Sequence, residues 1–111
     1  MNKLITVAVI DSGIYPHIDF KNRIVAFKDF VNGRKNAYDD CGHGTHVSGI
    51  IAGSGYASHG RIKGICPAAS LAGIKVLDRL GNGRIENVLD AAGWIISCLL
   101  YTSPSPRDRQ K

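Results

Sequence analysis

The sequence predicts an α/β domain with a mostly parallel sheet, in which strands alternate with helices. Short runs rich in β-branched and apolar residues are typical of strands, and the segments between them place apolar residues at helical spacing. The 111 residues fit within one domain. Such alternation favours right-handed crossovers that keep the strands parallel. The expected elements are, in order, residues 4–10, 23–30, 43–53, 70–77 and 85–96.

The first expected strand, residues 4–10, is apolar on both faces. A run of this kind suits a buried, parallel, central strand. Asp11 would stand just past its carboxyl end, at the edge of an α/β sheet where ligands and chemistry gather. Asp11 also begins the tripeptide Asp-Ser-Gly, in which an aspartate commonly bonds its own backbone in a turn. The segment by itself leaves both interpretations open.

The two expected helices differ in how clearly the sequence predicts them. Residues 43–53 are rich in glycine and threonine, so this helix needs tertiary packing, and Gly53 is a plausible stop. Its apolar positions are Val47, Ile50 and Ile51, and its small residues at 44, 49 and 52 leave room for a neighbouring backbone. Residues 85–96 predict one apolar face, made of Ile85, Val88, Leu89, Ala92, Ile95 and Ile96.

The formal charge of +5 by itself allows a nucleic-acid or membrane-surface partner. The last 14 residues carry Arg107, Arg109 and Lys111 against Asp108, and without them 11 basic and 8 acidic residues leave +3. No nucleic-acid partner is therefore expected. No apolar run reaches the roughly 18–20 residues that span a bilayer, so no membrane partner is expected either. No signal peptide is visible at the start, which slightly favours the cytoplasm and leaves the localisation open.

A cluster of possible metal ligands lies in the middle of the chain. His43 and His46 share a helix face, and Asp39, Asp40 and Cys41 are close by, so a zinc site is conceivable. The cluster does not match His-Glu-x-x-His, and no second cysteine pair stands at ligand spacing. No metal site is predicted. The alternative function is a small non-catalytic module that binds a metal or an anionic partner.

A second interpretation joins Asp11 to His43. A carboxylate at a strand end can hold an imidazole in one tautomer, and the imidazole can then act as general base for a serine. The spacing is compatible with this arrangement.

Three motifs resemble the subtilisin-like serine proteases (peptidase family S8, the subtilases). Val7–Ile14 with His17-Ile18-Asp19 is similar to the segment around the family's catalytic aspartate, and Asp40–Gly53 to its catalytic histidine segment. Gly64–Leu71 with Lys75-Val76-Leu77 resembles the family's next stretch. The resemblance covers about residues 4–97 and implies a truncated, subtilisin-like three-layer α/β fold. It also implies proteolysis by an Asp-His-Ser triad.

The resemblance also implies site residues. Asp11 would be the orienting acid and His43 the general base, whereas His46 would be structural, buried and hydrogen-bonded. Gly81, Asn82 and Gly83 match the family's loop that pairs with the backbone of a polypeptide substrate; a plain surface turn is the alternative. Asp19 matches a position that binds calcium in some members. The loop at residues 54–63 departs from the calcium-loop pattern, so no cofactor is predicted, although calcium remains possible in the full-length family.

Two family elements are missing from this sequence. The Gly-Thr-Ser motif that contains the nucleophile and the oxyanion-hole asparagine both lie far downstream in the family. Cys41 is not expected to replace the serine, because it lies on the loop of the base itself. The resemblance therefore implies a serine endopeptidase as the full-length parent and an inactive fragment as this chain.

The carboxyl-terminal residues resemble something else. Cys98–Asp108 looks like one reading frame of a transposase-type adapter used in DNA sequencing libraries. Such segments are set aside in fold reasoning. We therefore expect residues 1–97 to be the N-terminal part of a subtilisin-like peptidase domain, and residues 98–111 to be a non-native, adapter-derived tail.

Overall fold

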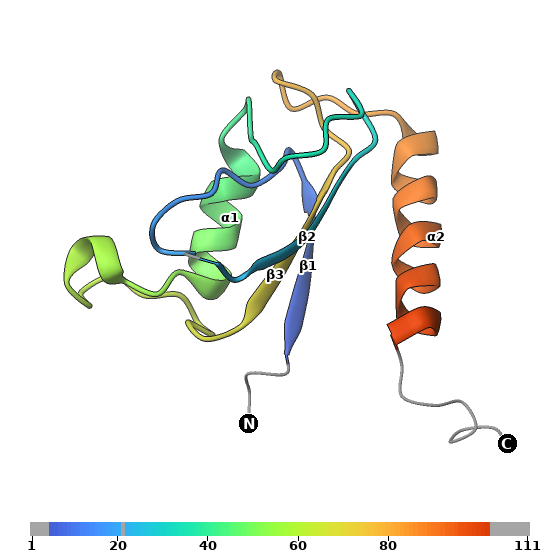
Figure 1. Ribbon diagram of the computed structural model, residues 1–111. Coiled ribbons are helices and arrows are strands. Elements are labelled where there is room, and N and C mark those ends of the chain that lie inside the picture. Colours follow the sequence, from blue (N-terminus) through green and yellow to red (C-terminus); the bar gives the residue numbers. More distant parts are fainter. Residues whose placement is uncertain (1–4, 21, 103–111) are drawn as a thin grey trace, which may run out of the picture.

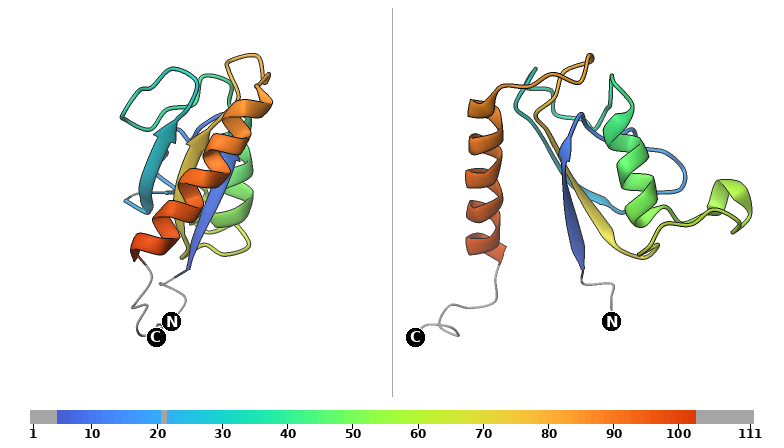
Figure 2. Two further views of the ribbon diagram at one scale, coloured as in Figure 1. Left: turned by 90° about the vertical axis from the view of Figure 1, so that its right-hand side faces the viewer. Right: turned by 180° about the vertical axis from the view of Figure 1, so that it is seen from behind.

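The computed structural model describes residues 5–20 and 22–102. Within them, three parallel strands form one sheet in the order β1-β3-β2. Helix α1 covers one face of this sheet and helix α2 lies on the other (Figure 1, Figure 2). The predicted α/β class, parallel sheet and three-layer arrangement are confirmed. The elements are β1 (Thr6–Asp11), β2 (Ile24–Asp29), α1 (His43–Ala52), the short 3-10 turn η2 (Tyr56–Ser58), β3 (Ser70–Lys75) and α2 (Ile85–Thr102).

The position predicted for the first strand is wrong within the described residues. The central strand is β3, and β1 pairs with it alone. In β1 only Val9 and Asp11 are buried, and Ile10 is 42% exposed. The strand ends at Asp11 itself, one residue later than predicted. An apolar run indicates a strand, but long-range pairing decides which strands become its neighbours.

Helix α1 packs on the sheet through small residues. Gly44, Ser48 and Ala52, four residues apart, are buried along one line of the helix. Gly49 faces open space, and Ile50 is 51% exposed, so these two do not take the packing roles predicted for them. The core between α1 and the sheet consists of Val9, Ile14, Phe20, Ala52, Ala69 and Leu71.

Helix α2 is longer than predicted, and Ile95 is the member of its predicted apolar face that packs against the described core cluster. It continues to Thr102 instead of ending at residue 96, and so crosses the predicted boundary between residues 97 and 98. It packs through Ala91, Trp94 and Ile95 against Ile74 and Val76 of the chain at β3. Residues 103–111 of the predicted tail lie outside the described residues, and the tail's origin stays a prediction. Most of the predicted apolar face is exposed, including Ile85, Leu89 and Ile96.

The start of the sheet is held by Arg23. Its guanidinium donates to the backbone oxygens of Ala69 (2.5 Å), Asp19 (2.6 Å) and Ala52 (2.7 Å), which joins three separate segments. The opposite edge, where all three strands end, carries the loops before α1 and after β3 (Figure 1). In the part of the chain that the structure describes, no helix combines the length and hydropathy needed to cross a membrane.

Candidate active site

Asp11 and His43 meet at the edge where the strands end. The Nδ1 atom of His43 lies 2.8 Å from Oδ2 and 2.9 Å from Oδ1 of Asp11. Asp11 is 9% exposed, whereas the side chain of His43 is 63% exposed. A proton on Nδ1 donates to the carboxylate and leaves Nε2 as the atom that can accept a proton. The predicted association of these two residues is present, with the imidazole open to solvent.

Asp11 is fixed by its own strand end. Its backbone oxygen accepts the N–H groups of Val76 (2.9 Å) and Leu77 (3.2 Å), which extend the pairing beyond β3. Its Oδ1 also accepts the N–H of Ser12 at 2.7 Å. The bond to the following residue, expected for a turn aspartate, therefore coexists with the contact to His43. The turn bond is therefore present, and the functional interpretation of Asp11 stays a prediction.

The segment that carries His43 is organised by Asp39. Its Oδ1 accepts from Ser12 Oγ (2.8 Å) and from the N–H groups of Cys41 (3.1 Å) and Gly42 (2.8 Å). Its Oδ2 accepts from the N–H (2.8 Å) and Oγ1 (2.5 Å) of Thr45. We call these residues, with Gly44, the Asp39 network. Sequence reasoning considered Asp39 only as a metal ligand and missed this role.

Two further hydrogen bonds and one close backbone contact hold the start of α1 against the segment that follows β1. Ser12 Oγ accepts the N–H of Gly44 at 2.9 Å. A Cβ on Gly44 would lie 2.1 Å from the backbone oxygen of Gly13, so only glycine fits. Thr45 Oγ1 in turn accepts the N–H of Tyr15 at 2.9 Å. The first turn of α1 is therefore bound directly to the loop that follows Asp11.

Burial and hydrogen bonding shift the pKa of Asp39 in opposite directions. Burial alone raises its pKa, but the hydrogen bonds from Thr45, Gly42 and Ser12 outweigh burial, so the pKa of Asp39 lies below the ordinary value. Asp29, at the end of β2, behaves in the same way. Burial again opposes ionisation, and donation from Tyr38 Oη and from the N–H groups of residues 31, 32 and 34 lowers the pKa of Asp29.

Lys75 is a second residue that sequence reasoning did not place in the site. Its side chain is fully buried, and Nζ donates to Ser12 O (2.8 Å), Leu77 O (2.6 Å) and Asp40 Oδ1 (2.7 Å). A buried ammonium is tolerated when it is paired and hydrogen-bonded in this way. Lys75 lies opposite Asp11 in the β1–β3 register. An isolated lysine in an otherwise apolar strand is the signal that could have indicated it.

The loop predicted to bind substrate follows β3 at the same edge of the sheet as Asp11 (Figure 1). Asp78 organises it: its Oδ1 accepts the N–H groups of Leu80 (2.9 Å) and Asn82 (3.0 Å). These bonds from Asn82 and Leu80 lower the pKa of Asp78. Gly81 has a φ of 82°, which favours glycine. Gly83 pairs with Leu77, and a Cβ there would lie 2.6 Å from the oxygen of Val76.

The structure also places His46 and the side chains that were considered as metal ligands. His46 is exposed, so the expectation that it is buried is wrong; α1 turns its line of small residues inward and His46 away from the sheet. The side chains of His43, Asp39 and Asp40 are bound to Asp11, to the Asp39 network and to Lys75. Within residues 5–20 and 22–102, no three His, Cys, Asp or Glu side chains form a group that could hold a metal ion.

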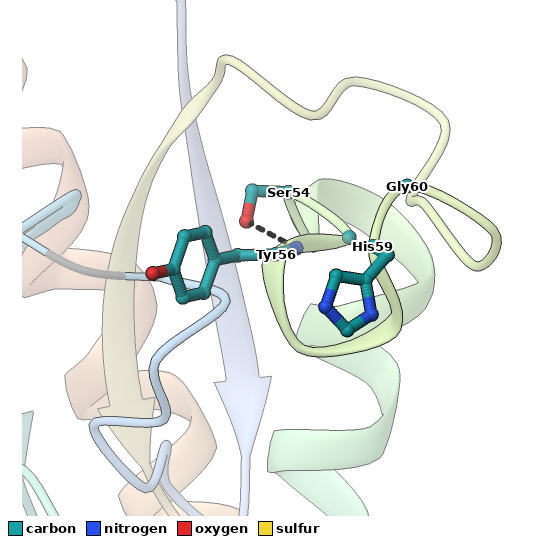
Figure 3. Close-up of a pocket in the computed structure, with 5 residues that line it drawn as sticks. Ser54, Tyr56, His59 and Gly60 are labelled. Carbon is teal, nitrogen blue, oxygen red and sulfur yellow. Dashed lines mark hydrogen bonds between the residues drawn. The ribbon is translucent and has the colours of Figure 1, made fainter.

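A separate hollow lies beyond the other end of α1. Figure 3 shows it in the loop around η2, lined by Ser54, Gly55, Tyr56, His59 and Gly60. Ser54 Oγ accepts the N–H of Tyr56 at 3.1 Å. Because α1 begins at His43 and the loop starts after the helix ends, this hollow does not belong to the Asp11–His43 site.

Comparisons with known proteins identify relatives of this chain in sequence and in fold. A sequence model of the subtilase family, peptidase family S8, matches residues 2–109. The chain belongs to the subtilase family. Serine protease AprX of Bacillus subtilis (strain 168) is 44% identical over 104 residues, which are 94% of this chain and 23% of AprX. The major intracellular serine protease of the same strain is 42% identical over 105 residues, which are 89% of this chain and 30% of that protease.

A solved subtilase has the same fold. The crystal structure of a cold adapted subtilisin-like serine proteinase matches with a TM-score of 0.73 and 33% identity, over 86% of this chain and 33% of that one. The chain spans a third or less of the length of each of these relatives. The predicted membership in the subtilases and the subtilisin-like fold are confirmed.

Two glycines of α1 provide a test of the close approach to β1. Gly44→Ala places a methyl group against Gly13, and we expect it to destabilise the chain by at least about 2 kcal/mol. Gly49→Ala, in the same helix, meets nothing within 4 Å and should stabilise the chain by up to about 1 kcal/mol. Urea unfolding measures both. Equal effects of the two substitutions would contradict the close contact.

The lowered pKa values of Asp29 and Asp39 predict how stability depends on pH. Both carboxylates ionise more readily in the folded chain, so their contribution is complete above the unfolded-state pKa of about 3.9 and is lost as the pH falls through the folded pKa. Urea unfolding at a series of pH values from about 6 to about 2 measures this loss. The double variant Asp29→Asn/Asp39→Asn should be less stable at the upper end and show a flatter decline. An unchanged slope in that variant would contradict the assignment.

Proposed function

We propose that this chain supplies the acid and the base of an Asp-His-Ser triad in a serine endopeptidase. The observation that carries the proposal is the 2.8 Å contact between His43 Nδ1 and the carboxylate of Asp11, at the carboxyl end of β1. Membership in the subtilases supports it. The substrate is a polypeptide, and neither a nucleic acid nor a membrane is proposed as a partner.

The roles follow from the contacts. Asp11 holds the Nδ1–H tautomer of His43 and stabilises the imidazolium that forms when Nε2 accepts the proton of the serine hydroxyl. The exposed imidazole can be reached by that hydroxyl. His43 then gives that proton to the leaving amine as the peptide C–N bond breaks. In the second half, a water molecule attacks the acyl-enzyme while His43 takes its proton, and His43 returns the proton to the serine oxygen as the acyl–serine bond breaks. Gly81, Asn82 and Gly83 lie at the same edge, where the loop would line an extended substrate, although both backbone groups of Asn82 are bound to Asp78.

The nucleophile belongs to a segment that this sequence does not contain. Ser12 is buried and its hydroxyl is bound to Asp39, and Ser48 is also buried. None of the chain's serines stands in a Gly-Thr-Ser motif. We therefore propose that the 111 residues by themselves do not hydrolyse peptide bonds. Three of the five side chains that suggested a metal, His43, Asp39 and Asp40, are bound within the protein, which favours the catalytic proposal over a metal-binding module.

A chimera tests the triad. Residues 1–97 joined to the downstream part of AprX should hydrolyse a peptide substrate and react with a fluorophosphonate probe. Asp11→Asn and His43→Ala should each lower kcat by about 10⁴-fold or more, because the tautomer or the base is lost. Cys41→Ser is the matched control on the same loop and should retain activity. The chain of 111 residues should show neither hydrolysis nor labelling.

Two outcomes of the chimera experiment would overturn the proposal. The first is full activity in either the Asp11→Asn or the His43→Ala chimera. The second is a folded, unsubstituted chimera that lacks both hydrolysis and labelling.

We also propose that this part of the family fold needs no calcium. Asp19, at the position that binds calcium in some relatives, uses Oδ1 to accept the N–H of Ala57 at 2.8 Å, and its backbone oxygen accepts from Ser54 at 3.0 Å. The thermal unfolding midpoint of the chain should therefore be the same with calcium and with a chelator. A rise in Tm with calcium that disappears in Asp19→Asn would contradict this.

A further inference from the structure

We propose that Asp39 is a positioning residue for the Asp11–His43 pair, acting through Ser12 and the first turn of α1. This inference rests on the proposed function, because it assigns a role in setting the geometry of the acid and the base. Among the described residues, the hydrogen bonds of the Asp39 carboxylate come from Ser12, Cys41, Gly42 and Thr45 and from neither side chain of the pair. The carboxylate accepts these five hydrogen bonds from the two segments that carry the pair.

The first step concerns the segment after Asp11. Ser12 follows Asp11 directly, and its hydroxyl donates to Asp39 at 2.8 Å while it accepts the N–H of Gly44 at 2.9 Å. Ser12 is fully buried, so water cannot replace these partners without opening the site. One hydroxyl therefore links the residue next to the acid with the residue next to the base.

The second step concerns the start of α1. Gly42 precedes the helix with a φ of 100° and has no side chain with which to cap it. Asp39 replaces the missing cap, because it accepts the N–H groups of Gly42 and Thr45. An ionised carboxylate is also favoured at a helix N-terminus. The direction in which α1 begins, and with it the backbone of His43, depends on this carboxylate.

The third step concerns the contact between the segment after Asp11 and the start of α1. Gly44 lies against Gly13 with no room for a Cβ, so a small shift of either backbone moves both catalytic residues relative to one another. Asp39 itself pairs with Gly13, and Tyr38 O accepts the N–H of Ile14 at 3.1 Å. When Asp39 loses its charge, the Nδ1 contact of His43 to Asp11 should be populated less. The neutral imidazole then loses its preference for the Nδ1–H tautomer.

The test reads the tautomer of His43 in the full 111-residue chain by ¹⁵N NMR of the neutral ring. The unchanged chain should hold mainly Nδ1–H, and Asp11→Asn marks the opposite tautomer. Asp39→Asn should lower the ratio of Nδ1–H to Nε2–H about tenfold, as expected for the loss of one or two hydrogen bonds.

Asp29→Asn is the matched control for a general loss of stability. Like Asp39, Asp29 accepts several hydrogen bonds, four in its case, and has a lowered pKa, but it is buried and lies at the end of β2. Its substitution should leave the tautomer ratio of His43 unchanged. Equal changes in Asp29→Asn and Asp39→Asn would overturn the proposal, as would an unchanged ratio in Asp39→Asn.

A second variant covers the case in which Asp39→Asn does not fold. Ser12→Ala keeps the charge of Asp39 and removes both bonds of the Ser12 hydroxyl, the one it donates to Asp39 and the one it accepts from Gly44. It should still lower the ratio, and an unchanged ratio overturns the proposal. The readout needs no catalysis and is therefore independent of the chimera. If the chimera is inactive but Asp39→Asn lowers the tautomer ratio of His43, the proposed function alone is rejected. If the chimera is active but Asp39→Asn leaves the ratio unchanged, the positioning role alone is rejected.

Discussion

The approach of the Gly44 backbone to the Gly13 backbone is the constraint on which the rest of the site depends. A Cβ on either glycine would lie 2.1 Å from a backbone oxygen, that of Gly13 or of Tyr38. Contacts this short exclude every side chain and bring the start of α1 onto the end of β1. Asp11 and His43 are 32 positions apart in the chain, and this contact is what places them within hydrogen-bond distance.

Close packing of polar backbone leaves N–H donors that must be satisfied, and the buried Asp29 and the half-buried Asp39 at the edge of the sheet provide acceptors. Asp39 takes up the N–H groups at the start of α1, and Asp29 takes up those of the turn after β2. Lys75 supplies the positive charge and ties Ser12, Leu77 and Asp40 together. Each buried charge is offset by several hydrogen bonds, which is the condition under which burial is tolerated. These bonds surround the pair formed by the buried Asp11 and the exposed His43.

Local patterns predicted most of the secondary structure, and long-range packing decided the remainder. Residues 4–10 indicated a strand, but β3 rather than β1 became central. The period of residues 85–96 indicated a helix, yet most of the predicted face is exposed, and α2 packs through Ala91, Trp94 and Ile95. His46 shares a motif with His43 and is exposed, because the small residues of α1 face the sheet. Periodicity records which faces are apolar, and the available partner decides which face is used.

The sequence by itself determined the order of strands and helices, the motifs that carry Asp11 and His43, and the resemblance to the subtilases. These features are local, since each depends on residues close together in the chain. Only the tertiary structure decided that Asp39, Ser12 and Lys75 belong to the site. Their roles depend on hydrogen bonds between segments up to 63 positions apart, and no local pattern contains that information. The physical reason is that a buried polar group is defined by the partners that folding brings to it.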